Sequence, residues 1–187
     1  SYDVPTLSDG VYQIGTPNEL MWFNREAQTN LGISAKLTAD ICINEDVNAE
    51  SPYEWKPIGT SSSKYTGTFD GAEHTISGLY INNKSANNTG LFGYTAAGSV
   101  IENLTISDSK IISTGNYAGA FVGDLVGGIK NCHTTDTVSV SGNQYVGGIV
   151  GELDSGAYIT QCSNKGSVTG ASSTVGGLAG RVYSALS

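Results

Sequence analysis

Two carboxylates, Asp124 and Glu152, recur one repeat apart and are the residues whose spacing comes nearest to a known chemistry. Each follows the last glycine of a similar phrase, GAFVG or GGIVG. If the phrases stack as parallel strands, the carboxylates lie about 5 Å apart, near the separation used by retaining glycosidases. Any two stacked carboxylates have this spacing, however, and Arg181 continues their column as a counter-ion. We therefore interpret the pair as structural.

A second polar cluster lies in the segment FDGAEHTISG, which brings Asp70, Glu73 and His74 together. The Asp-Gly step is typical of a turn, and the histidine begins the next strand. No nucleophile or orienting partner accompanies these residues. His133 likewise lacks a carboxylate or thiolate at the spacing of a metal site. The sequence therefore predicts no catalytic residue, no cofactor and no metal ion.

Three tyrosines, Tyr94, Tyr117 and Tyr145, are the best candidates for contacts with a ligand. Tyr117 and Tyr145 occupy equivalent positions of neighbouring repeats, and Tyr94 lies one repeat away near the same corner. Aromatic side chains on an outer face can stack on sugar rings or anchor a protein partner. The alternative is that the rings pack against the turns that carry them.

Composition excludes several classes of partner. The chain has 187 residues, a formal net charge of -8 and only 14% charged residues. Such a surface has little to neutralise phosphates, so we expect neither nucleic-acid binding nor attraction to an anionic membrane. No apolar run approaches the ~18 residues of a spanning helix, so we expect no membrane insertion.

The elements that position these residues are set by an internal repeat. A glycine-rich phrase occurs as GLFG, GAFVG, GGIVG and GGLAG, with last glycines at 93, 123, 151 and 180, which are 30, 28 and 29 residues apart. A second landmark occurs as IENLTI, IKNCHT and ITQCSN. Apolar residues alternate within each unit, as they do in strands. A period near 29 with short strands and regular turns predicts an all-β fold, a parallel β-helix or β-solenoid, which we expect to wind right-handed.

Stacking of the repeats makes specific columns. We expect Ile76, Ile101, Ile129 and Ile159 to share an inward column, and Asn103, Asn131 and Gln161 an amide ladder. The recurring glycines of the phrase, such as Gly119, Gly147 and Gly176, leave room for the neighbouring coils and supply the positive φ of tight corners.

The chain has three cysteines, Cys42, Cys132 and Cys162. Cys132 and Cys162 fall in one inward column on adjacent coils, so we expect both to be buried, reduced thiols, with Cys42 also unpaired. A disulfide between the adjacent coils is the alternative, and its geometry is demanding.

The first part of the chain differs from the repeats. Thr16, Pro17 and Glu19 have the order of a capping box with proline at the first helical position, which predicts a short amphipathic helix over 17–28. We expect this helix to cover the open end of the first coil. Residues 1–35 then form a cap and 36–187 the coils of one domain, with repeats near 87–114, 115–142, 143–171 and an incomplete 172–187.

The phrases GLFG, AFVG, GIVG and GLAG resemble the G-L-hydrophobic-G phrase of GLUG-motif proteins of bacterial surfaces. The lead-in EWKPIGTSSSKYTGTFDGAEHTISGLYINN is similar to the segment that precedes the first repeat in those proteins. The resemblance covers nearly the whole chain from about Gly10. It implies a secreted or wall-attached protein that is adhesin-like, or the non-catalytic part of a large surface protein such as an immunoglobulin A peptidase.

Two functions remain open. The first is a non-catalytic binding or spacer module at the bacterial cell surface, presenting a stacked face to a host surface protein or glycan. The second is a carbohydrate-active enzyme of the β-helix kind, a polysaccharide lyase or glycoside hydrolase. Small, scattered polar residues favour the first. We also interpret the chain as a fragment of a longer solenoid, and we expect its last coil to associate end to end through residues 172–187 or to fray.

Overall fold

The computed structural model describes residues 1–84, 86–172 and 174–183. Its elements are β1 (Thr6–Ser8), β2 (Val11–Ile14), α1 (Pro17–Glu26), β3 (Ser34–Leu37), β4 (Ile41–Cys42), β5 (Thr68–Ser77), β6 (Tyr80–Asn83), β7 (Phe92–Tyr94), β8 (Val100–Ser107), β9 (Ser109–Ser113), β10 (Val122–Leu125), β11 (Gly128–Thr134), β12 (Val138–Gly142), β13 (Val146–Gly147), β14 (Val150–Leu153), β15 (Tyr158–Thr160), β16 (Ser163–Asn164), β17 (Ser167–Gly170), β18 (Val175–Gly176) and β19 (Ala179–Val182).

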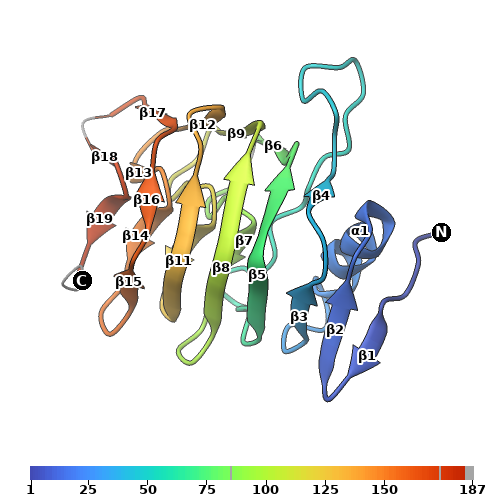
Figure 1. Cartoon of the computed structure of the whole chain (residues 1–187). Helices are drawn as coiled ribbons and strands as arrows, with labels where there is room; N and C mark the ends of the chain where they lie inside the picture. The colour runs from blue at the N-terminus through green and yellow to red at the C-terminus, as the bar shows by residue number, and fades with distance from the viewer. Residues whose placement is uncertain (85, 173, 184–187) are drawn as a thin grey trace.

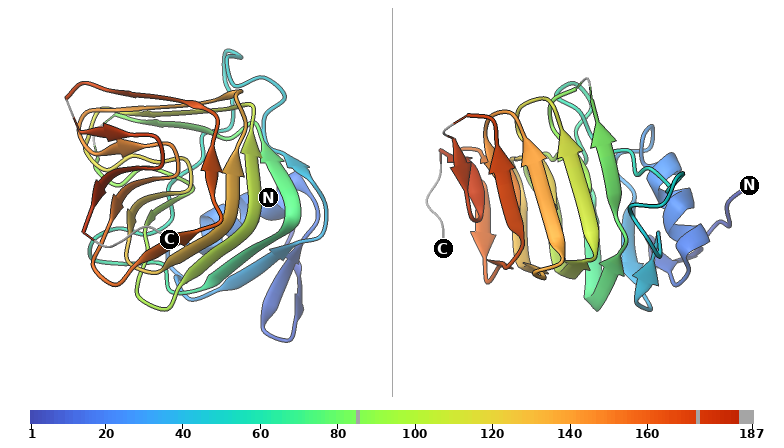
Figure 2. Two further views of the ribbon diagram at one scale, coloured as in Figure 1. Left: turned by 60° about the vertical axis from the view of Figure 1, so that its left-hand side comes forward. Right: turned by 90° about the horizontal axis from the view of Figure 1, so that it is seen from above.

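These strands wind into a β-solenoid, as the repeat predicts. One sheet has the order β1-β2-β3-β5-β8-β11-β15, with β4 beside β5 and β16 beside β11. Two four-stranded sheets have the orders β19-β14-β10-β7 and β17-β12-β9-β6, and β13 pairs with β18. Figure 1 shows the strands of the large sheet side by side, and Figure 2 shows the coils stacked with the chain ends at opposite ends of the stack. Neighbouring coils pair in parallel, while β1 and β2 form an antiparallel hairpin. The right-handed winding stays a prediction.

Helix α1 covers the N-terminal end of the stack (Figures 1 and 2). Its N-cap is Thr16, whose hydroxyl accepts a hydrogen bond from the backbone N–H of Glu19, and the Glu19 carboxylate accepts one from the Gly15 N–H. Leu20 and Phe23 are fully buried. The helix ends at Glu26, two residues before the predicted end, because the following Ala27 closes its last turn as the C-cap.

The expected columns of side chains follow the observed pairing. Ile101, Ile129 and Ile159 lie opposite one another and are buried. The expected alignment of Ile76 with Ile101 is wrong, because the structure pairs Ile76 with Ile106. The cause is a register shift within β5, where the chain takes positive φ at two residues (Ala72 and Glu73) that have no counterpart in β8.

The amide column marks a sharp corner of each coil. Asn103, Asn131 and Gln161 have φ of 56°, 51° and 55°, a left-handed conformation that asparagine tolerates better than most residues. The Asn131 amide donates to the Asn103 side-chain oxygen at 2.8 Å. The same corner is braced on its outer side by Lys130, whose ammonium lies 3.3 Å from the Glu102 carboxylate.

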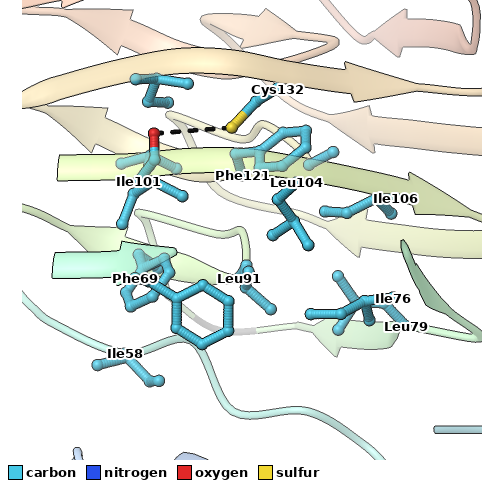
Figure 3. Close-up of a cluster of buried hydrophobic side chains, with 14 of the residues drawn as sticks. Ile58, Phe69, Ile76, Leu79, Leu91, Ile101, Leu104, Ile106, Phe121 and Cys132 are labelled. Carbon is cyan, nitrogen blue, oxygen red and sulfur yellow. Dashed lines mark hydrogen bonds between the residues drawn. The ribbon is translucent and has the colours of Figure 1, made fainter. Parts of the chain in front are cut away.

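The inward side chains make one continuous hydrophobic core along the stack. Figure 3 shows its middle part, where Phe69, Ile101, Leu104 and Phe121 point toward one another from different coils. Cys132 is also fully buried there, and its thiol donates to the Ile101 carbonyl at 3.6 Å.

All three cysteines are free thiols. The expected burial of Cys162 is wrong, because this side chain is only partly buried. It lies in the loop between β15 and β16, the last strands of the large sheet among the described residues, so no further strand of that sheet covers it.

The last described coil exposes apolar side chains that earlier coils bury. Val175 and Val182 are 38% and 42% exposed, whereas Val146 and Leu153, their partners in the preceding coil, are fully buried. Part of the predicted incomplete repeat, residues 173 and 184–187, lies outside the described residues. End-to-end association through this coil stays a prediction.

The recurring glycines are needed because the chain of the same or the next coil passes close to them. A Cβ at Gly119 would lie 2.6 Å from the Ile149 carbonyl oxygen, and one at Gly147 would lie 2.0 Å from the Val150 oxygen. The expectation of a positive φ at these glycines is wrong, since neither has one. Steric room alone selects glycine here.

Gly147→Ala should therefore lower the free energy of unfolding by about 2–3 kcal/mol, the usual range for overpacking against backbone. Gly177→Ala is the matched control, because a Cβ at Gly177 meets nothing within 4 Å, and we expect a change below about 0.5 kcal/mol. Guanidinium unfolding of both variants measures the difference. Equal stability of the two would contradict the steric explanation.

Candidate functional site

One polar column lies at the ends of the strands β7, β10, β14 and β19. In the pairing of these strands, Asp124 lies opposite Tyr94 on one side and Glu152 on the other, and Glu152 lies opposite Arg181. The column predicted from the glycine phrases is thus confirmed. Parallel pairing places each side chain directly above its equivalent in the next coil.

The two carboxylates of this column are buried. Asp124 is 5% and Glu152 3% exposed. The Arg181 guanidinium donates to the Glu152 carboxylate at 2.9 Å from Nη2 and 3.1 Å from Nε. The sequence suggests a weak exposed ion pair at this place, and that interpretation is wrong, because the neighbouring coils exclude water from Glu152.

Asp124 has no arginine of its own. Burial, followed by the nearby charges of Glu152 and Asp154, raises its pKa from 3.8 to about 8. Among the described residues no hydrogen-bond partner reaches its Oδ1. The neutral, protonated acid is therefore the stable form of Asp124 at neutral pH, with its hydroxyl facing Asp154 and Tyr94.

Tyr94 shares this environment. Burial and then the charges of Asp124 and Asp154 raise the pKa of its phenol to about 12. The Lys64 ammonium lies 4.9 Å from the centre of its ring, at cation–π distance. Tyr94 thus keeps its proton at neutral pH and can donate a hydrogen bond to the acidic column.

Tyr117 and Tyr145 lie in a second column at the adjoining corner. Their rings stack with centroids 5.1 Å apart and an angle of 15° between their planes. Both residues have positive φ, 65° and 56°. Arg181 reaches this stack as well, since its guanidinium carbon lies 4.1 Å from the Tyr145 centroid and its Nη2 donates to the Tyr117 hydroxyl at 3.1 Å.

The last glycine of each repeat makes room for these tyrosine corners. A Cβ at Gly151 would lie 2.5 Å from the Tyr117 carbonyl carbon, and one at Gly180 would lie 2.3 Å from that of Tyr145. The repeated glycine phrase therefore permits the close approach that holds the two tyrosines in line.

The three tyrosines predicted as contacts are thus placed in two ways. Tyr117 and Tyr145 stack directly, whereas Tyr94 belongs to the carboxylate column and meets no other tyrosine ring. Sequence reasoning missed the role of Arg181 in joining the two columns, and it missed Tyr183, whose ring also lies 4.8 Å from the guanidinium carbon. An unpaired arginine in a chain with few cations was the available indication.

The FDGAEH cluster has structural roles. Asp70 accepts hydrogen bonds from the Ala72 N–H at 2.8 Å and the Asn103 amide at 3.1 Å, which fixes the turn. Glu73 accepts from the Asn131 amide at 2.6 Å, and the His74 ring lies 3.1 Å from Asp40. These side chains point to different partners, as the turn interpretation predicts.

The arrangement suits neither metal binding nor carboxylate catalysis at the places considered. Within residues 1–84, 86–172 and 174–183, no group of three or more His, Cys, Asp or Glu side chains could hold a metal ion. His133 hydrogen-bonds to Ser163 at 2.7 Å and Asn131 at 3.0 Å. The buried Asp124 and the ion-paired Glu152 offer no open surface on which a sugar ring could sit between them.

An open groove lies elsewhere, between the long loop that precedes β5 and the strand β6. It has a volume of 540 Å³, and its lining comes from 54–57 and 81–84. Sequence analysis did not identify this groove, because its two walls are far apart in the chain. None of the candidate tyrosines lines it.

The fold and these columns define a repeat solenoid, and comparison with known proteins identifies the repeat. Residues 142–169 match the model of the GLUG motif. The chain is 35% identical over 111 residues to Halomucin of Haloquadratum walsbyi, an alignment that covers 54% of this chain and 1% of that protein. It is 31% identical over 96 residues to a putative Gly-rich membrane protein of Evansella cellulosilytica, covering 51% of this chain and 11% of that protein.

A solved structure shares the whole architecture. The crystal structure of a putative immunoglobulin A1 protease from Bacteroides ovatus superposes with a TM-score of 0.73, at 18% identity, over 99% of this chain and 66% of that chain. The resemblance to GLUG-motif proteins and the β-solenoid fold are thereby confirmed. Among the described residues no helix is long and apolar enough to span a membrane.

The raised pKa of Asp124 makes stability depend on pH. Between about pH 4 and pH 8 the folded chain keeps a proton that the unfolded chain releases, so the free energy of unfolding should fall as pH rises, by at most about 1.4 kcal/mol per unit. Asp124→Asn removes this titration. We expect the variant to show a flatter profile and to exceed the wild type in stability above pH 8.

Denaturant unfolding at pH 5, 6, 7 and 8 tests the expectation. Asp136→Asn, on an exposed turn, serves as the matched control and should follow the wild-type profile. Parallel profiles for the wild type and Asp124→Asn would contradict the proposed protonation of Asp124.

Arg181 should matter more to stability than an exposed ion-pair partner does. Arg181→Met leaves the Glu152 carboxylate buried and unpaired, which we expect to cost about 2–4 kcal/mol. Lys130→Met, which breaks the more exposed pair with Glu102, should cost less than about 1 kcal/mol. Thermal unfolding at pH 7 compares them, and a smaller loss for Arg181→Met would contradict this ranking.

Proposed function

We propose that this chain is a non-catalytic binding module of an extracellular protein at the bacterial cell surface. The GLUG motif and the likeness to a Gly-rich membrane protein and to Halomucin support a surface location. The observation that carries a binding role is the stack of Tyr117 on Tyr145 with Arg181 against both rings.

This stack has the composition of an interaction hot spot. Tyrosine and arginine dominate the energetics of many protein interfaces, because they offer large contact areas and directed hydrogen bonds. Tyr117 and Tyr145 are partly exposed, and the glycine contacts at Gly151 and Gly180 fix their backbone. A partner would therefore meet rings that lose little conformational freedom on binding.

The partner is proposed to be a surface protein or a glycan of a host. Both classes use tyrosine contacts, through ring edges and hydroxyl groups for proteins and through ring stacking for sugars. Tyr94, with its neutral phenol beside the carboxylate column, extends the contact surface by one further coil.

The alternative function is a carbohydrate-active enzyme, a polysaccharide lyase or glycoside hydrolase. The stacked pair of Asp124 and Glu152 motivates it, but the burial of both carboxylates and the ion pair to Arg181 weigh against it. A screen of polysaccharides for released reducing ends distinguishes the two functions. Activity that is lost in Asp124→Asn or Glu152→Gln would establish the enzyme.

The binding role is tested on immobilised glycans and on host cells treated with glycosidase or with protease. We expect the double variant Tyr117→Ala/Tyr145→Ala to bind at least about tenfold more weakly than the wild type. Tyr158→Ala is the control, because Tyr158 is 38% exposed on the large sheet and should leave binding unchanged. Which treatment abolishes binding identifies the class of partner, and wild-type binding by the double variant would contradict the assignment of the site.

A further inference from the structure

Cys132 and Cys162 lie opposite one another on adjacent coils. In the pairing of these coils, Lys130 is opposite Thr160 and His133 is opposite Ser163, an offset of 30 residues on both sides of the cysteines. The same offset places Cys162 against Cys132. Adjacent parallel strands hold facing Cα atoms about 4.8 Å apart, which is within the range that a disulfide spans.

The two thiols also contact each other. A hydrogen bond links the Cys132 and Cys162 side chains. Each thiol reaches a backbone carbonyl of its own coil as well, Lys130 at 3.5 Å for Cys132 and Thr160 at 3.3 Å for Cys162. The sulfur atoms therefore face one another across the gap between the coils and need no change of fold to approach.

The pair is chemically unequal. Cys132 is fully buried, and burial raises the pKa of its thiol. Cys162 is partly exposed, and the hydrogen bond from Cys132 lowers the pKa of its thiol. An accessible thiol with a lowered pKa beside a buried partner is the arrangement in which the first attacks a disulfide and the second resolves the product.

We propose that Cys132 and Cys162 are an oxidisable pair that reacts with small-molecule disulfides and closes a covalent link between two coils. The Cys162 thiolate attacks one sulfur of the disulfide, forming a mixed disulfide and releasing one thiolate. Cys132 then loses its proton to solvent and attacks the Cys162 sulfur, expelling the second thiolate. The two protein thiols are oxidised, and the small disulfide is reduced to two thiols.

Cys42 does not share this reaction. It is exposed, and the residue opposite it on the neighbouring strand is Ser77, so no second thiol can resolve a mixed disulfide there. Cys42 can be replaced by serine to leave only the pair.

The link would act on the candidate binding surface as well as on stability. The loop that it closes contains β12, β13 and β14, and with them Tyr145 and Glu152. Closing a loop of about 30 residues restricts the unfolded chain, so the melting temperature should rise by about 5–10 °C if the link is unstrained. The proposal rests on the thiol geometry and does not depend on what the tyrosines bind.

The experiment uses the whole chain with Cys42→Ser, incubated with oxidised glutathione at pH 8. Trypsin cleaves after Lys130 and Lys165, so both cysteines fall in the single peptide 131–165. We expect this peptide to lose the mass of two hydrogen atoms, and the protein to melt at a higher temperature until a reductant is added. A mixed disulfide that persists on Cys162, or an unmodified peptide, would overturn the proposal.

Single substitutions assign the two roles. With Cys132→Ser we expect glutathione to remain attached to Cys162, because no resolving thiol is left. With Cys162→Ser we expect Cys132 to react at least tenfold more slowly, because it is buried. Both variants are compared only after melting curves show that they are folded, and equal reaction rates for the two single thiols would overturn the division of roles.

Discussion

Parallel stacking of coils in exact register is the constraint on which every other feature depends. Backbone hydrogen bonds such as Phe121 N–H to the Ile149 carbonyl and Ile149 N–H to the Leu178 carbonyl, both 3.0 Å, tie each coil to the next. Each side chain therefore meets its equivalent about 4.8 Å away. A column works only if its members tolerate that neighbour, whether as a hydrophobic contact, a shared proton, an ion pair or a glycine.

The carboxylate column shows what this constraint does to charge. Stacking places Asp124 beside Glu152 in a site with little water, where two ionised groups would repel each other strongly. Arg181 neutralises one of them from the next coil, and a retained proton neutralises the other. The arrangement couples the stability of the stack to pH, and it leaves the carboxylates without access to a substrate.

The same spacing gives different results where the side chains differ. At one corner it stacks two tyrosines under an arginine, which makes a rigid surface for a partner. At another it brings two thiols together, one buried and one partly exposed, which makes a pair that can exchange with disulfides. Both corners lie on the coils between β11 and β19, so the candidate binding surface and the oxidisable pair occupy the same part of the solenoid.

The sequence by itself determined the solenoid, the capping helix and most of the columns, because repeats near 29 residues long carry their own alignment and alternation marks the inward face. It failed at Ile76, where a bulge in β5 shifts the register without any trace in the spacing of the glycine phrases. Only the tertiary structure decided how deeply Glu152 and Cys162 are buried and that Arg181 joins the acidic column to the tyrosines. Burial and contacts between columns depend on how coils cover one another in space, whereas the order within a column depends on the chain alone.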